Sequence, residues 1–230
     1  MRHGRKSKTQ RVDGTKRHLA IDGDLAGLIC GVAITPANKA ENPGVRQMLD
    51  SIEDRGRERQ ELFIDRGYLG APELEQRRKQ GLAIHCKPFP LHNGGRFTKD
   101  HFALDFANRT VTCPDGVGVP LEMHGVVHFP AKTGKPFHLK QDGTRSRSGR
   151  HLNIHPEEDF HQQLREIRKT PESRKQLRQK VAVEHRLSAI GRTQGTRARY
   201  KGERENLFDL RRHSAVHHLM VTARLLRQVA

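Results

Sequence analysis

The sequence has little apolar material. Only 33% of its 230 residues are hydrophobic, aromatic residues make up 5%, and tryptophan is absent. No run approaches the roughly 18 consecutive apolar residues of a membrane span, and the basic start MRHGRKSKTQR is not followed by the apolar stretch of a signal peptide. These absences predict a cytoplasmic protein with a modest core and no membrane partner.

Cysteine is also scarce. Cys30, Cys86 and Cys113 are far apart and form no CxxC pair, which argues against a disulfide framework and against a zinc ribbon. We expect three buried or chemically idle thiols.

Acidic residues are few beside basic ones. The chain has 43 Lys and Arg but 26 Asp and Glu, a formal net charge of +17, and its 15 histidines add positive charge at low pH. A surface of this kind favours a polyanionic partner. Seven basic residues in the first 18 form either a phosphate-contacting edge or a disordered tail. They are Arg2, Arg5, Lys6, Lys8, Arg11, Lys16 and Arg17.

Local patterns predict an α/β domain. Two short apolar runs between residues 17 and 35 predict a β-hairpin, and Val45, Met48, Leu49 and Ile52 lie at helical spacing. Strand 62–64, helix 71–80 and strand 82–84 then predict a parallel pair with a crossover. Asp65 follows the first of these strands, at the edge where α/β sheets gather their ligands.

The pattern changes twice along the chain. Between residues 87 and 155 helical periodicity is lost, Gly and Pro are dense, and short β-like runs predict an inserted β-rich subdomain. Helices are predicted near 157–169, 171–190 and 203–229. We therefore divide the chain into 1–86, 87–155 and 156–230, the last completing the domain that the first begins.

Two carboxylates are candidates for a metal site. On a helix through 171–190, Glu184 falls inside the apolar arc of Leu177, Val181 and Leu187. Asp65 and an inward-facing Glu184 would suit Mg²⁺, which prefers carboxylate oxygens and completes its shell with water and substrate phosphate. The alternatives are a boundary Glu184 paired with Lys180 or Arg186, and an Asp65 that only ends its strand.

Five segments in order resemble bacterial insertion-sequence transposases of the DDE class, whose catalytic domain is ribonuclease H-like. They are GRKSKTQRVDGTKRHLAID, VAITPANKAE, FIDRGYLG, VAVEHRL and RARYKGERENLFDLRRHSAVHHL. The resemblance implies that Asp65 is the second catalytic carboxylate and Glu184 the third. It implies Mg²⁺, or Mn²⁺ as a substitute, and phosphodiester hydrolysis and strand transfer at the element's ends. Transposon-end and target DNA would be partners of a nucleoid-associated protein, with homo-oligomers in the intact transposase.

The chain departs from this family at the first catalytic Asp, which has no counterpart here. We therefore expect an N-terminally truncated portion whose ribonuclease H-like mixed sheet lacks its first strand and which is catalytically incomplete alone. Asp13 and Asp22 are the available substitutes; otherwise they are a turn and a strand-ending residue.

The insertion departs as well. Relatives tend to carry a C-x-x-C-P-L-R-x-x-C pattern that suits zinc, and the cysteine positions fall here on Gly134, Phe137 and Gly143. Cys113 alone cannot make a tetrahedral zinc site, and His124, His128 and His138 are irregularly spaced around it. We expect no zinc.

Basic residues surround the third motif. Arg178, Lys180, Arg186 and Arg192 flank Glu184, and Arg197, Arg199, Lys201 and Arg204 follow, with Arg211 and Arg212 beyond them. We expect these residues to contact DNA phosphates, with Glu205 weakening the cluster slightly; the alternative is a solvated basic face.

Three functions fit the sequence. The first is a DDE transposase fragment, the second a non-enzymatic DNA-binding remnant that competes with full-length transposase, and the third a stand-alone nuclease that recruits Asp13 or Asp22.

Overall fold

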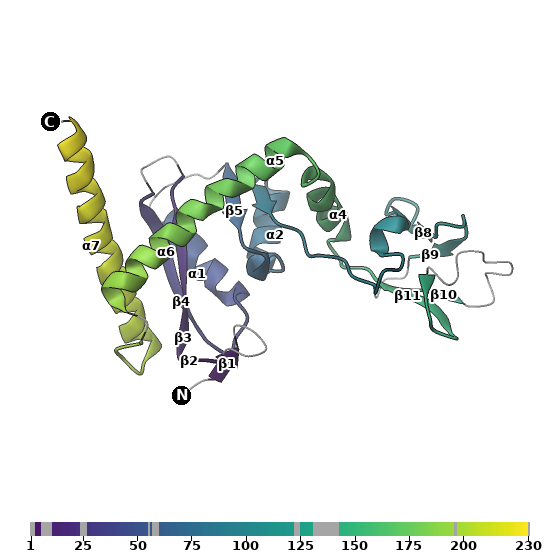
Figure 1. The fold of residues 1–230 in the computed structure, drawn as a ribbon, viewed down its shortest axis with the longest axis horizontal. Coiled ribbons are helices and arrows are strands. Elements are labelled where there is room, and N and C mark those ends of the chain that lie inside the picture. Colours follow the sequence, from purple (N-terminus) through teal and green to yellow (C-terminus); the bar gives the residue numbers. More distant parts are fainter. Residues whose placement is uncertain are drawn as a thin grey trace. The chain divides into compact units, whose positions relative to one another are not determined.

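The computed structural model describes residues 3–5, 11–23, 27–54, 56, 60–121, 125–130, 143–195 and 197–229 (Figure 1). The chain folds as two compact units, one made of Met1–Lys87 with Pro171–Ala230 and the other of Pro88–Thr170. In the part of the chain that the structure covers, no helix is both long and apolar enough to cross a membrane.

The first unit is mixed α/β. Its strands are β1 (His3–Arg5), β2 (Arg11–Asp13), β3 (Thr15–Ile21), β4 (Ile29–Pro36), β5 (Glu61–Ile64) and β6 (Ala83–Cys86). Its helices are α1 (Asn42–Glu53), the 3-10 turn η1 (Arg66–Tyr68), α2 (Pro72–Lys79), α5 (Pro171–Gln176), the 3-10 turn η3 (Leu177–Lys180), α6 (Val181–Gln194) and α7 (Glu203–Val229).

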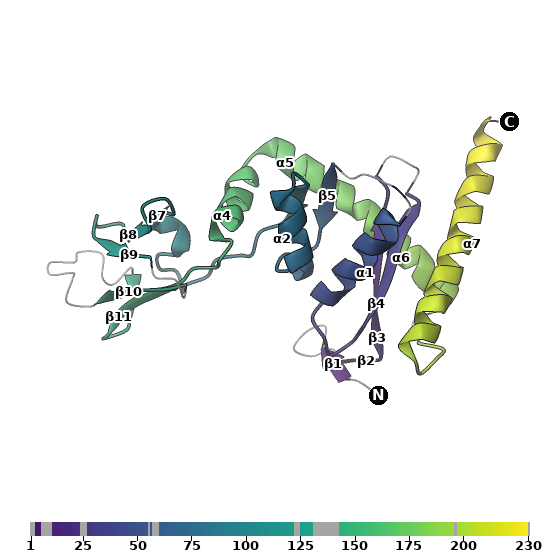
Figure 2. The same cartoon turned by 180° about the vertical axis from the view of Figure 1, so that it is seen from behind.

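The hairpin predicted near 17–35 is confirmed. β3 and β4 pair antiparallel, with Thr15 opposite Pro36 and a register shift between Ala20 and Ile21. Seven of the eight β4 residues are buried, because α1 covers one face of the hairpin while α6 and α7 lie against the other. α6 crosses in front of the hairpin in Figure 1, and α1 lies in front of it in Figure 2. A strand covered on both faces needs a continuous apolar sequence.

The predicted helix after the hairpin is α1, and its four apolar residues, Val45, Met48, Leu49 and Ile52, are all buried. Gly31 of β4 explains how closely this helix packs. A Cβ at position 31 would lie 2.9 Å from the main-chain oxygen of Met48, so a larger residue would push α1 away from the hairpin.

The predicted strand–helix–strand unit is also confirmed. β5 and β6 pair parallel, with Ile64 opposite Cys86, and α2 connects them. Pro72 begins α2, acidic residues occupy its first turn and basic residues its last, as the helix dipole favours. Within the described residues, β3–β4 and β5–β6 remain separate two-stranded sheets and do not join into one.

The core of the first unit lies between the hairpin and the C-terminal helices. Ile190 of α6 and Leu210 of α7 are almost fully buried there. They pack with Leu19, Ile29, Val32 and Ile34 of β3 and β4. The helix predicted to end near Ile190 continues to Gln194, and a 3-10 turn at 177–180 separates it from α5.

The second unit is rich in short strands, as its sequence predicts. It contains the 3-10 turn η2 (Lys99–His101), β7 (Ala103–Asp105), β8 (Thr110–Thr112), β9 (Gly118–Pro120), β10 (Val126–Pro130), β11 (Gly149–Asn153) and α4 (Glu158–Ile167). β7, β8 and β9 form one antiparallel sheet, and β10 and β11 pair antiparallel. Their core includes Phe102, Val111, Cys113, Val127 and Phe129.

Glu158, expected only to begin a helix, is buried in this second unit. Its carboxylate accepts hydrogen bonds from Lys99 (2.6 Å) and Arg165 (2.8 Å) and from the backbone N–H of His155. Burial raises the pKa of Glu158, but these donors outweigh it and leave the pKa below its ordinary value. The buried charge is therefore matched.

A polar network joins β3, α6 and α7 in the first unit. Arg17 donates to Oε1 of Gln194 (2.9 Å) and to the carbonyl of Gly195 (3.2 Å). Gln194 in turn donates to Asp209 (2.8 Å), whose other oxygen accepts from Arg212 (2.7 Å). Asp209 is only 1% exposed. Burial raises its pKa, but the Gln194 hydrogen bond and the charges of nearby cations outweigh burial and lower the pKa overall.

A second contact joins β3 to the end of β5. His18 shares a hydrogen bond of 2.6 Å with the Tyr68 hydroxyl, and its Nε2 lies 2.7 Å from Oγ1 of Thr35. Burial, together with the charge of Lys16, lowers the pKa of His18 to about 4. His18 is therefore a neutral core residue at physiological pH.

We predict that Asp209→Ala lowers the free energy of unfolding by about 3 kcal/mol, because it leaves Gln194 and Arg212 without their acceptor. Arg212→Ala, which removes a half-exposed partner of the same carboxylate, should cost less than about 1 kcal/mol. Urea unfolding of both variants measures the difference; equal losses would show that Asp209 does not organise the network.

Stability should fall in mild acid through His18. Its folded-state pKa lies below the unfolded value, so unfolded chains bind a proton that folded chains do not, and stability is lost as pH falls from about 6.5 towards 4. The loss should reach about 2 kcal/mol at pH 5. Urea titrations at pH 7 and pH 5 test this against His18→Gln, whose stability should change less between the two pH values. An unchanged pH dependence in the variant would contradict the assignment.

Candidate active site

Asp65 lies directly after β5, where its sequence position predicts it. Its backbone is extended, the turn η1 follows, and the side chain is 66% exposed. Lys180, at the end of η3, makes an ion pair with Oδ1 of Asp65. This contact joins residues 115 positions apart and brings the start of α6 to the end of β5.

Glu184 lies in the first turn of α6, four residues after Lys180. Residues four apart share a helix face and differ by about 6 Å along the axis, so Glu184 follows Lys180 on the side of α6 that begins at Asp65. The expectation that Glu184 points inward is wrong, because its side chain is exposed. The buried face of α6 is set by Ile190 and Gln194, about a quarter turn away from Glu184.

Tyr68 and His18 support the end of β5 but were not among the predicted site residues. Tyr68 ends η1, and burial followed by the charges of Glu41 and Asp65 raises its pKa. The phenol is therefore a neutral hydrogen-bonding group at physiological pH. The only sequence signal for this role is the tyrosine three residues after Asp65; its buried partner is 50 residues away.

Cys86 lies beside Asp65 at the parallel strand end. Burial raises the pKa of its thiol to about 11, against the opposing charge of Lys180. The thiol therefore stays protonated at neutral pH. All three cysteines are buried and none forms a disulfide, as the sequence predicts.

The donor chemistry at Asp65 and Glu184 suits a magnesium ion. Both side chains are exposed carboxylates, and Mg²⁺ is commonly held by one or two carboxylates while water and phosphate fill its other positions. Among the residues that the structure describes, no group of three His, Cys, Asp or Glu side chains could hold a metal. Each carboxylate therefore has the donor chemistry that Mg²⁺ prefers.

Asp13 and Asp22 lie at opposite ends of β3. Asp13 ends β2 and pairs in register with His3, and Asp22 follows β3, where Cys30 donates a weak hydrogen bond to it. His18 marks the position on β3 nearest Tyr68. Asp22 is four residues beyond His18, which is about 13 Å along a strand. Asp13 lies before the opposite end of β3.

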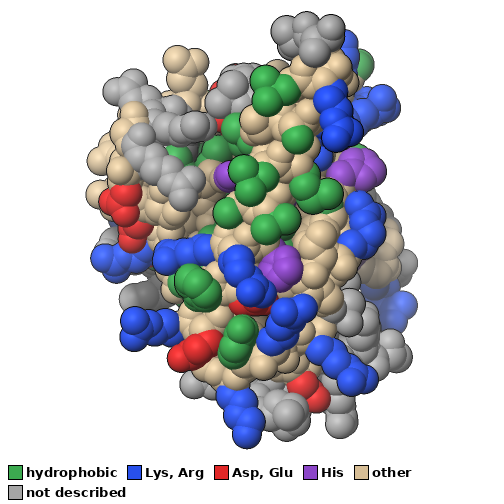
Figure 3. All heavy atoms as spheres, turned by 90° about the vertical axis from the view of Figure 1, so that its left-hand side faces the viewer, with side chains coloured by type: hydrophobic (Ala, Val, Ile, Leu, Met, Phe, Trp, Pro, Cys, Tyr) green, Lys and Arg blue, Asp and Glu red, His purple; other side chains and the backbone are tan. Residues whose placement is uncertain are grey.

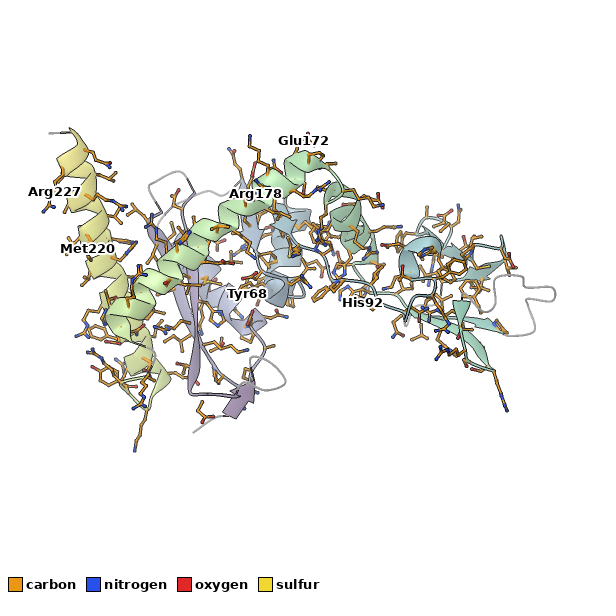
Figure 4. All side chains as sticks on the ribbon, viewed as in Figure 1. Tyr68, His92, Glu172, Arg178, Met220 and Arg227 are labelled. Carbon is orange, nitrogen blue, oxygen red and sulfur yellow. The ribbon has the colours of Figure 1, made fainter. Side chains whose placement is uncertain are left out.

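The basic residues predicted to contact DNA differ in their surroundings. Arg178 is exposed on η3, where Figure 4 labels it, and Lys180 pairs with Asp65. Arg186 is half-buried and lies against Gly27 of the hairpin. The remaining predicted DNA-contacting residues have exposed side chains. They are Arg192, Arg197, Arg199, Lys201 and Arg204. The N-terminal Arg2, Lys6 and Lys8 lie outside the described residues.

The structure describes only some of the positions considered for zinc. Gly134, Phe137, His124 and His138 lie outside the described residues. Cys113 is buried in the core of the second unit, and His128 stacks on His151 with ring centroids 4.2 Å apart while contacting the carbonyl of Ser148. The absence of zinc stays a prediction.

Comparison with known proteins identifies the family. The model of the family described as "Transposase DDE domain" matches residues 1–217. No curated protein and no solved structure matches the chain. Because the match covers nearly the whole sequence, the chain belongs to the transposase DDE domain family, whose members act on DNA in transposition and generally use divalent metal ions.

Proposed function

We propose that Asp65 and Glu184 are metal-binding catalytic carboxylates of a transposase that hydrolyses phosphodiesters and transfers strands at the ends of an insertion sequence. One observation carries the proposal. The ion pair between Lys180 and Asp65 ties the start of α6 to the end of β5, so the two carboxylates named by the family's motifs belong to one exposed part of the first unit. Family membership supports the reaction class.

The chemistry divides between metal and protein. A bound Mg²⁺ would supply charge stabilisation and activate the attacking oxygen. Asp65 and Glu184 would donate carboxylate oxygens to it. Lys180, which neutralises Asp65 in this structure, carries a flexible four-carbon stem and three donors, so it is suited to pass from the carboxylate to a substrate phosphate. Tyr68 and His18 hold the strand end that carries Asp65.

DNA binding would come from the exposed basic side chains. Arg178 lies two residues before Lys180, and Arg192, Arg197, Arg199, Lys201 and Arg204 follow Glu184 along the chain. Such residues hold phosphates and set the position of DNA without reading its sequence. The proposed partners are transposon ends and target DNA, and association with the nucleoid would follow from DNA binding. The intact transposase would form homo-oligomers.

The small number of candidate metal ligands favours a second function. Two metals normally require more ligands than Asp65 and Glu184 provide, and the described residues contain no group of three metal-binding side chains. A non-enzymatic DNA-binding protein that competes with an active transposase would need only the basic residues. It would bind DNA equally well with and without divalent metal.

Neutralising the carboxylates separates the two functions. Asp65→Asn and Glu184→Gln should each weaken Mg²⁺ or Mn²⁺ binding at least ~10-fold and abolish metal-dependent cleavage of DNA carrying the element's ends, because each replaces a charged carboxylate with a neutral amide that binds a divalent cation more weakly. DNA binding should be unchanged or slightly tighter, since each removes a negative charge near phosphates. Titration calorimetry and a cleavage assay measure the two effects.

Asp50→Asn, at an exposed carboxylate of α1, is the matched control and should behave like the wild type. Equal metal affinity in all four proteins would refute the site. Metal-independent DNA binding without cleavage, in wild type and variants alike, would favour the second function.

DNA affinity should fall steeply with salt. Each phosphate neutralised contributes roughly −0.9 to the slope of log affinity against log salt, so replacing Arg197, Arg199 and Lys201 with Gln should reduce the slope by up to about 2.7. Replacing Arg46, Arg78 and Lys79 of α1 and α2 is the charge-matched control. Fluorescence anisotropy with duplex DNA at several salt concentrations measures both; identical slopes would show that the 197–201 segment does not contact DNA.

A further inference from the structure

The solvent-facing side of α7 carries large apolar side chains among basic ones. Phe208 is 67% exposed, Leu219 71%, Met220 61% and Leu226 67%. Figure 3 shows hydrophobic side chains gathered along the middle of the face that α7 presents, with Lys and Arg around them. In Figure 4, Met220 and Arg227 lie on the side of α7 away from the hairpin. Isolated exposed apolar residues are ordinary, but a continuous patch marks an interaction site.

The opposite side of α7 is already used. Leu210, Ser214 and Val221 are buried, and Nε2 of His218 accepts a hydrogen bond from the backbone N–H of Ile29. A surface helix normally buries one face and exposes a polar one. α7 keeps large apolar side chains exposed after this packing.

The exposed residues follow the spacing of a helix–helix seam. We define the α7 stripe by six exposed positions that succeed one another in steps of four and three. They are Phe208, Arg212, Ala215, Leu219, Thr222 and Leu226. At 100° per residue all six fall within about 40° of one line along the helix. Alternating steps of four and three are the pattern by which two helices interlock side chains, so the fitting partner is another helix.

We propose that the α7 stripe pairs antiparallel with the α7 stripe of a second copy of this chain. Pairing about the midpoint between Ala215 and Leu219 sets Phe208 against Leu226 of the second copy and Ala215 against its Leu219. The two polar positions, Arg212 and Thr222, then oppose each other. The small Ala215 then faces the large Leu219, and the two polar residues face each other. The α7 stripe is therefore complementary to itself, as a two-fold interface requires.

Charge favours the same direction. A parallel pair in register would set each Arg212 beside the other, whereas the antiparallel pair separates them. Glu205 of one helix would lie on the same flank as Arg227 of the other, because residues on one side of the seam meet across an antiparallel two-fold. Arg212 brings little uncompensated charge to the seam, since Asp209 of its own helix already accepts its hydrogen bond.

DNA is a poorer occupant of this surface. Phosphate contacts need basic or polar donors, and Phe208, Leu219 and Leu226 offer none. The exposed basic residues between α6 and α7 supply that chemistry instead. The α7 stripe is therefore the surface for a protein partner, and the exposed basic residues between α6 and α7 are the surface for DNA.

Cysteine pairing tests the geometry in the full chain. Ala215→Cys and Leu219→Cys are made separately, mixed, and oxidised gently. Because position 215 opposes position 219 of the second copy, a disulfide-linked dimer should form in the mixture and far less in either variant alone. The native cysteines are buried, and wild type serves as the background. Links within each variant alone would indicate a parallel pair and overturn the proposal.

Mass measured by light scattering tests the interface itself. Wild type should approach the mass of two chains as concentration rises, and Leu219→Glu should raise the dissociation constant about 30-fold or more, as a central interface residue does. Ile167→Glu, at a half-exposed residue of the second unit, is the matched control, and circular dichroism checks folding. If Leu219→Glu misfolds, Leu226→Glu near the helix end replaces it. A wild type that stays monomeric at every concentration would overturn the proposal and leave the stripe to another segment or partner.

Discussion

The arrangement of the first unit depends on the buried carboxylate of Asp209. It accepts from Gln194 at the end of α6, and Gln194 accepts from Arg17 of β3, so one anion fixes three elements. α6 is 14 residues long, about 21 Å, and its other end begins at Lys180 and Asp65. A helix held at one end by Asp209 carries Lys180 and Glu184 at the other. The position of the candidate site is therefore set about 20 Å from the network that secures it.

Acidic residues are the scarce component of this chain, and the structure uses them selectively. Asp209 and Glu158 are each about 1% exposed and each is matched by basic partners. A chain with 43 basic residues supplies such cationic partners readily. Arg197, Arg199 and Lys201 stay exposed on the segment between α6 and α7. A polyanion can then bind without competing with the contacts that hold the fold.

Local sequence patterns predicted the hairpin, α1 and the β5–α2–β6 unit, because each depends on neighbouring residues. They also predicted that Asp65 would end a strand. They failed where a residue's environment is set from far along the chain. Glu184 was expected to face inward from its apolar neighbours, yet Ile190 and Gln194 decide which face of α6 packs, through contacts with β3, β4 and α7. Asp209 and Asn206 belong to a recognisable motif, but their burial depends on α6 and on the turn before α7.

α7 connects the network to the outer surface. Asp209 lies on its inner side, and Arg212, which donates to Asp209, is also a position of the exposed α7 stripe. If a second helix covers the stripe, it removes water from around Arg212, and an ion pair strengthens as solvent is excluded. The gain would pass through Asp209 to Gln194 and so to the end of α6. Association of two chains would then strengthen the Arg212–Asp209 ion pair, because the same guanidinium group belongs to the α7 stripe and to the network.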